Sequence, residues 1–122
     1  MDNFTDFLRG VGKKPGFYLT PDKHGHCGSI SHLRTFIVGI QVGQHLKYDA
    51  TALDGFTEWV CHRYRAPMSG RDWHGHILEQ AGDDEALAFQ MFFELFEEFS
   101  KERERIGSEA IRARYLALMR DR

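Results

Sequence analysis

The feature that most constrains the fold of this chain is a closely spaced run of phenylalanines in its second half. The run consists of Phe89, Phe92, Phe93, Phe96 and Phe99. Side chains three or four residues apart lie on one face of an α-helix, so this spacing predicts a long helix with a broad aromatic face. The opposite face carries several glutamates, which anionic lipid headgroups would repel. We therefore expect the aromatic face to lie in the core of a globular protein.

The rest of the chain shows the same helical periodicity. Five further segments carry apolar residues three or four positions apart, and no segment alternates polar and apolar residues over the length of a β-strand. We find no internal repeat, linker or second domain. The sequence therefore predicts an all-α fold in which residues 1–122 form one compact bundle of five or six helices.

The expected starts of these helices depend on short polar side chains, which accept hydrogen bonds from the unpaired N–H groups of a first turn. The expected caps are Asp2 or Asn3, Ser29 or Ser31, Asp54, Ser69 and the pair Gly107-Ser108, with Asp83 opening the aromatic helix. Gly10 and Gly12 should weaken the first helix. Gly39 and Gly43 lie four apart on the second, and we expect another part of the chain to pack closely against them.

Composition and charge exclude several classes of protein. A chain of 122 residues fits one domain with a core of its own. Its formal net charge of −2 argues against a dedicated nucleic-acid binder. No apolar stretch approaches the roughly 18 residues of a membrane span, and the N-terminus lacks the features of a signal peptide. We expect a cytoplasmic protein that binds neither membrane nor nucleic acid, with Cys27 and Cys61 reduced.

Seven histidines raise the question of a metal site, since two His-Gly-His triplets stand out. His24, His26 and Cys27 form the one cluster of zinc-compatible ligands, but a structural zinc site needs four. His74 and His76 are two apart on an expected helix and point about 200° away from each other. We expect solvated or hydrogen-bonded histidines, with no metal and no cofactor.

Catalytic motifs are also missing from the sequence. It contains no nucleophile elbow, no phosphate-binding loop and no dinucleotide-binding glycine pattern. Cys61 and His62 are neighbours on one helix and diverge by about 100°, so adjacency alone does not make them a reactive pair. One alternative stays open, namely a small enzyme or ligand binder that uses histidine, such as a metal-independent nuclease.

Five segments, taken in order, carry a resemblance to a known family. They are FTDFLRGVGKKPGFYL, SISHLRTFIVGIQVG, FTEWVCHRY, SGRDWHGHIL and DDEALAFQMFFELFEEF, which together extend from residue 4 to residue 99. This order resembles a family of small bacterial proteins of about this length, many of them encoded beside toxin genes. The chain departs from the family pattern where Arg71 and Asp72 separate Gly70 from Trp73. The resemblance implies an immunity protein that binds and blocks a cognate toxin domain and has no enzymatic activity.

The best candidate for the toxin-binding surface is the outer face of the aromatic helix. Its carboxylates are Glu94, Glu97, Glu98 and Glu102. Toxin domains that act on nucleic acid tend to have basic clefts, which an acidic surface would complement. The alternative is a plain solvated face, partly neutralised by neighbouring basic residues.

A second candidate surface is the loop from Lys13 to Gly28, where Pro15 and Gly16 predict a type II turn. That turn would bring Phe17, Tyr18 and Leu19 back across the bundle.

Overall fold

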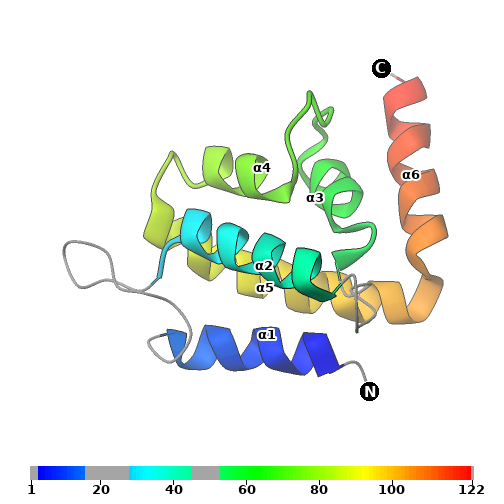
Figure 1. The fold of residues 1–122 in the computed structure, drawn as a ribbon. Coiled ribbons are helices and arrows are strands. Elements are labelled where there is room, and N and C mark those ends of the chain that lie inside the picture. The colour runs from blue at the N-terminus through cyan, green and yellow to red at the C-terminus, as the bar shows by residue number, and fades with distance from the viewer. Residues whose placement is uncertain (1–2, 16–27, 45–52, 122) are drawn as a thin grey trace.

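The computed structural model describes residues 3–15, 28–44 and 53–121. These residues form six α-helices and no β-strand, which confirms the predicted all-α bundle. The helices are α1 (Asn3–Lys13), α2 (Ile30–Gln44), α3 (Phe56–Tyr64), α4 (Trp73–Gln80), α5 (Glu85–Ile106) and α6 (Ser108–Arg120). In Figure 1, α5 crosses the middle of the molecule behind α2, with α1 below, α3 and α4 above, and α6 at one end.

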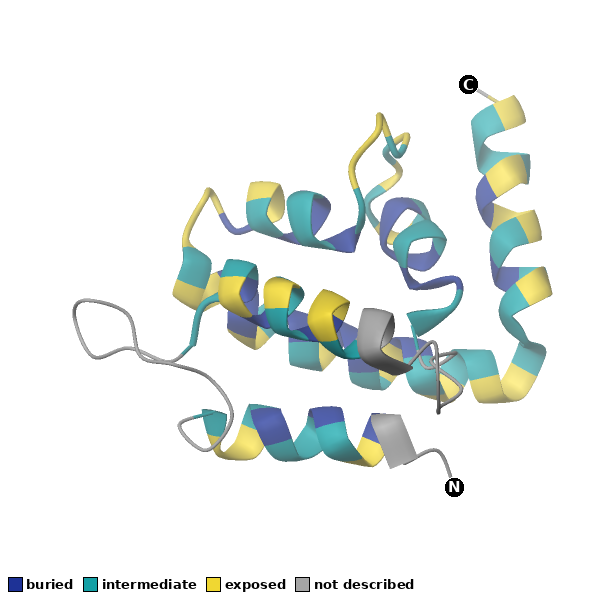
Figure 2. Cartoon of the chain, in the orientation of Figure 1, coloured by how far each residue is buried: buried dark blue, intermediate teal, exposed yellow. Residues whose placement is uncertain are grey.

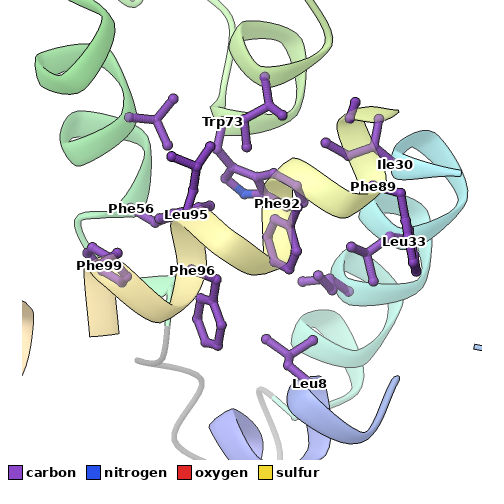
Figure 3. Packing of buried hydrophobic residues seen from close by; sticks show 14 of the residues in the cluster. Leu8, Ile30, Leu33, Phe56, Trp73, Phe89, Phe92, Leu95, Phe96 and Phe99 are labelled. Carbon is purple, nitrogen blue, oxygen red and sulfur yellow. The ribbon is translucent and has the colours of Figure 1, made fainter. Parts of the chain in front are cut away.

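The aromatic helix α5 is the centre of the bundle and contacts each of the other five helices. Phe92, Phe96 and Phe99 are fully buried, as the spacing of the phenylalanines predicts. Figure 3 shows these rings between α2 on one side and α3 and α4 on the other, with Leu8 of α1 approaching Phe96. Phe93 is half-buried and lies against α1. The phenylalanine stripe thus supplies the common apolar surface on which the other helices pack.

Phe56, the first residue of α3, completes the aromatic centre of the core. Its ring lies 5.6 Å from that of Phe92 in an edge-on contact and 5.0 Å from that of Phe99. The indole of Trp73, the first residue of α4, lies 5.9 Å from Phe56 and 4.9 Å from Phe92. Aromatic pairs at these separations add about 0.5–1.5 kcal/mol each to the energy of burial. The first turns of α3 and α4 are therefore fixed by side chains of α5.

Two of the predicted helix starts are wrong by one residue or more because another residue takes the capping position. α4 begins after Asp72, whose carboxylate accepts the backbone N–H of His74 at 3.1 Å, so Ser69 is not the cap. α5 begins after Asp84, which accepts the N–H of Leu87 at 3.0 Å. Asp83, expected there, has a φ of 64° and lies in the turn before the helix.

The predicted cap of α3 is also wrong, because a glycine stands in its place, whereas Gly107 precedes α6 in agreement with the prediction for the Gly107-Ser108 pair. Gly55, with a φ of 87°, precedes α3, while the carboxylate of Asp54 bonds instead to Arg112 of α6. Gly107 separates α5 from α6 with φ 86° and ψ 157°, a region open almost only to glycine. By contrast, Ser29 accepts the N–H of His32 at 3.3 Å, as expected for the start of α2.

The glycines inside helices have different surroundings. α1 extends through Gly10 and Gly12 to Lys13, and the ring of Phe93 on α5 occupies the space beside Gly12. A Cβ atom at Gly12 would lie 2.8 Å from Cδ1 of Phe93. Gly39 is exposed, and no atom of the described residues lies within 4 Å of where its Cβ would be, so the close packing expected at Gly39 is wrong.

No helix in the described ranges combines the length and the apolar character needed to cross a lipid bilayer.

Candidate partner-binding surface

The four carboxylates predicted to face a partner lie on α5, but most of them bond to other helices. Glu97 receives two hydrogen bonds from the guanidinium of Arg9 on α1, at 2.5 Å from Nε and 3.1 Å from Nη2. These bonds raise the pKa of Arg9 above its ordinary value. Glu94 is exposed and forms no ion pair with any of the described residues. Glu97 therefore ties α1 to α5, and Glu94 remains available to a partner.

The other two carboxylates connect α5 to α3 and α6. Glu98 accepts a hydrogen bond from Arg63 of α3 at 3.0 Å, and the Arg63 guanidinium lies 5.8 Å from the centre of the Trp59 ring. Glu102 accepts the indole N–H of Trp59 at 3.3 Å and pairs with Arg114 of α6. Arginines of three neighbouring helices thus neutralise three of the four carboxylates. The outer face of α5 is less acidic in the fold than its own sequence indicates.

A polar cluster that joins α2, α4 and α5 is not predictable from the sequence. The hydroxyl of Ser31 lies 2.9 Å from Nε2 of His74 and makes a closer contact with a carboxylate oxygen of Glu85. The second Glu85 oxygen accepts the backbone N–H of Ser31 at 3.0 Å. From the sequence, Ser31 is recognisable only as a helix cap. No motif links it to His74 or Glu85, which are 43 and 54 positions away.

The hydrogen-bond pattern of this cluster differs from that of a catalytic serine. In a Ser-His-acid triad the carboxylate holds the histidine, and the histidine accepts the serine proton. Here the carboxylate of Glu85 contacts Ser31 directly and accepts its only proton, so Nε2 of His74 donates to the Ser31 oxygen. The arrangement holds three helices together and leaves the serine hydroxyl without a histidine that accepts its proton.

The remaining reactive side chains of the core are also engaged or shielded. The thiol of Cys61 is fully buried, and burial, with a smaller effect of Glu58, raises its pKa to about 11. Such a thiol is protonated at neutral pH and a weak nucleophile. His62 lies beside it in sequence. Partial burial, followed by the positive charges of Arg114 and Arg65, lowers the pKa of His62.

His76, which is 2% exposed, supports the turn that connects α3 to α4. Its Nε2 atom lies 2.9 Å from the carbonyl oxygen of Met68, so this nitrogen carries the proton and donates it. On the other side of Met68, the hydroxyl of Tyr115 on α6 accepts the backbone N–H at 3.1 Å. Both backbone groups of Met68 are therefore held by side chains of neighbouring helices. A buried histidine in a hydrogen bond agrees with the expectation from the sequence.

The same turn contains an uncommon backbone conformation. α3 ends with hydrogen bonds from Arg65 N–H to His62 and from Ala66 N–H to Cys61, which is the Schellman pattern. Arg65 occupies its left-handed position, with φ 54° and ψ 44°. Farther along the turn, Ser69 and Gly70 also have positive φ values. Left-handed residues other than glycine, asparagine and aspartate are rare, so Arg65 stands where glycine would be less strained.

Two of the sequence predictions concern residues outside the described part of the chain. They are the ligand cluster of His24, His26 and Cys27, and the turn at Pro15–Gly16 with Phe17, Tyr18 and Leu19, of which only Pro15 is described. Among the residues that the structure describes, no group of three or more histidine, cysteine, aspartate or glutamate side chains is arranged to hold a metal ion.

Comparisons with protein-family models, with curated proteins and with solved structures find no match to this chain. The function is therefore inferred from the residues and from the geometry described above.

Proposed function

We propose that this protein is an immunity protein, which binds and neutralises a cognate bacterial toxin domain in the cytoplasm of the producing cell and has no enzymatic activity. The five sequence segments that occur in this order between residues 4 and 99 support the proposal through their resemblance to proteins encoded beside toxin genes. A protein of this kind needs a stable scaffold and a specific surface, and it needs no reactive group.

The observation that carries the proposal is that reactive side chains are hydrogen-bonded or buried inside the fold. The Ser31 hydroxyl donates to Glu85, the Cys61 thiol is buried with a raised pKa, and the His76 imidazole donates to Met68. The Ser31 and His76 groups stabilise contacts between segments of the bundle, and the Cys61 thiol is buried away from solvent. Binding by the surface therefore fits the described structure better than chemistry by its side chains.

The most direct cellular test is co-expression with the toxin domain encoded beside this gene. We expect induction of the toxin domain alone to stop growth and co-expression of the intact chain to restore it. The acidic surface is tested with Glu94→Lys, because Glu94 is the one of the four candidate carboxylates that forms no ion pair with a described residue. Its matched control is Glu104→Lys, the same charge change at another exposed position of α5. Growth that stays arrested in the presence of the intact, folded chain would contradict the proposal.

The alternative, a small enzyme that uses histidine, is favoured by one contact. Ser31 Oγ lies 2.9 Å from His74 Nε2, within reach of a proton transfer. For this pair to act, His74 would have to take the proton that Glu85 now receives. If the chain protects cells by catalysis at this pair, a folded Ser31→Ala variant should lose the protection, whereas a binding protein with an intact fold should keep it.

A further inference from the structure

We infer that the turn formed by residues 65–71, between α3 and α4, docks into the partner, and that it enters a concave protein surface lined by carboxylates. This inference rests on the proposed function, because it names the contact surface and the partner chemistry of the same binding protein. In Figure 1 the turn projects above the bundle between α3 and α4, and Figure 2 shows that much of it is exposed. Its exposed residues are Arg65, Pro67, Ser69, Gly70 and Arg71.

The first reason for the inference is that the turn projects outward and is nevertheless fixed in shape. The two backbone groups of Met68 bond to Tyr115 and His76, at 3.1 and 2.9 Å, and the Met68 carbonyl also accepts the N–H of Arg71 at 3.0 Å. One half-buried residue thus anchors the middle of the turn, while residues on both sides of it are exposed. A loop held in one conformation before binding loses little conformational entropy when it docks, which favours tight binding.

The second reason is the identity of the residue at the strained position. Two helices of this chain end in the same Schellman hydrogen-bond pattern. At the end of α4 the left-handed position is filled by Gly82, with φ 65°. At the end of α3 it is filled by Arg65, with φ 54°. Backbone strain of this kind concentrates at functional sites. A guanidinium that contacts the partner would explain why arginine, and not the less strained glycine, stands at this exposed position.

The third reason is the charge of this end of the molecule. Residues 62–71 contain Arg63, Arg65 and Arg71 and no carboxylate, although the whole chain has a net charge of −2. Arg65 has no ion pair with any described residue, and Arg71 is in an exposed pair with Glu79 at 2.8 Å. Exposed pairs of this type are worth about 0–1 kcal/mol, so a partner carboxylate can compete for Arg71.

A protein partner fits these observations better than a nucleic acid does. Nucleic-acid binders spread positive charge over a large surface and carry a strong basic excess. The chain has no such excess, since its net charge is −2, and the turn itself carries two arginines, one on each side of Pro67 and Met68. The arginines at its two ends match carboxylates, which accept paired hydrogen bonds from a guanidinium. A narrow projection of this kind suits a concave site, in the manner of an inhibitor that covers an active-site cleft.

The decisive variant is Arg65→Gly, because it removes the guanidinium and relieves the backbone at the same time. The probe is the purified toxin domain encoded beside this gene, titrated at about 150 mM salt. We expect Arg65→Gly to weaken binding by at least about tenfold, as for a central interface arginine, with a melting temperature equal to or above that of the parent. Arg105→Ala, a matched loss of an exposed arginine on α5, should bind within about twofold of the parent.

A second measurement locates the contact directly. Backbone amide resonances of residues 65, 66 and 68–71 should shift most when the toxin domain is added, and the shifts should vanish in the Arg65→Gly variant at matched concentration. Binding that is unchanged in Arg65→Gly, with shifts confined to α5 around Glu94, would overturn the inference and leave the proposed function standing. A single-stranded RNA of about 20 nucleotides that binds the parent more tightly than the toxin domain does would also overturn it.

The role of the anchor is tested with Tyr115→Phe, which removes the hydroxyl bonded to Met68 and keeps the ring. We expect the Met68 amide to exchange hydrogen faster and the complex to dissociate severalfold faster, while Arg65 stays in place. Unchanged dissociation despite faster exchange would show that a fixed turn is not required. A parent chain that does not bind the toxin domain at all would contradict the proposed function and the docking turn together.

Discussion

Two glycines within helices have opposite surroundings, and this difference determines what a methyl group would do at each site. The Cβ of an alanine at position 12 would lie 2.8 Å from the Phe93 ring, whereas at position 39 it would meet no atom within 4 Å. Replacing an unconstrained helical glycine by alanine normally stabilises a protein by about 0.5–1 kcal/mol. Gly12 is thus required by the contact between α1 and α5, and Gly39 is not.

We therefore predict that Gly39→Ala raises the free energy of unfolding by about 0.5–1 kcal/mol. Gly12→Ala should lower it by about 1–3 kcal/mol, because the Phe93 ring is pushed out of its place. Urea denaturation followed by circular dichroism measures both variants. Equal stabilisation by both substitutions would show that α1 does not pack closely on α5.

Arg65 illustrates a conflict between stability and function at the scale of one residue. A left-handed conformation costs an ordinary side chain about 1–2 kcal/mol more than it costs glycine. The chain uses glycine at the equivalent position after α4, where Gly82 ends the helix. A residue that is costly for folding and exposed to solvent is more readily explained by contact with another molecule than by the fold.

At the scale of the helix, α5 performs two tasks with its two faces. Its aromatic face forms the core, and three carboxylates of its outer face hold α1, α3 and α6. The carboxylates are partly exposed, with side-chain exposures of 40% for Glu97 and 52% for Glu98, so each ion pair adds little to stability. Most of the stabilisation by α5 must therefore come from its phenylalanines.

The aromatic face can be tested by comparing two of its members. The side chain of Phe96 is completely surrounded by core residues and has 0% solvent exposure. Phe93 is half-buried at the edge of the core, against α1. We predict that Phe96→Ala lowers the free energy of unfolding by about 3–5 kcal/mol and that Phe93→Ala lowers it by clearly less. The measurement is again urea denaturation. Equal losses at the two positions would mean that α1 covers Phe93 more completely than the structure shows.

At the scale of the whole molecule, the periodicity of apolar residues was sufficient to predict the helical bundle and its centre. The spacing of Phe92, Phe96 and Phe99 identifies the buried face of α5 without any knowledge of its neighbours. Helix starts were predicted less well, because several short polar residues stand near each start and only one of them accepts the cap hydrogen bond. Asp72 caps α4, for example, although Ser69 is an equally good candidate by type.

Contacts between distant segments lie beyond this kind of prediction. The outer face of α5 is acidic in the sequence because only its own residues are visible there. Arg9, Arg63 and Arg114, which neutralise it, come from three other helices. The polar cluster of Ser31, His74 and Glu85 likewise exists only after α2, α4 and α5 have packed. Knowing which side chains meet across the bundle therefore requires the fold itself.

At the scale of the whole molecule, the proposed function makes the chain a helical scaffold that acts by binding, and stoichiometry tests this claim most directly. A fixed amount of the toxin domain proposed as the partner is mixed with increasing amounts of the chain, and the remaining toxin activity is measured. Each molecule of a blocking protein inhibits one toxin domain and stays bound to it. We therefore predict that toxin activity falls in proportion to the amount of chain added and disappears near equimolar amounts. Complete inactivation by a small fraction of an equivalent, growing with time, would reveal catalytic turnover and contradict the account.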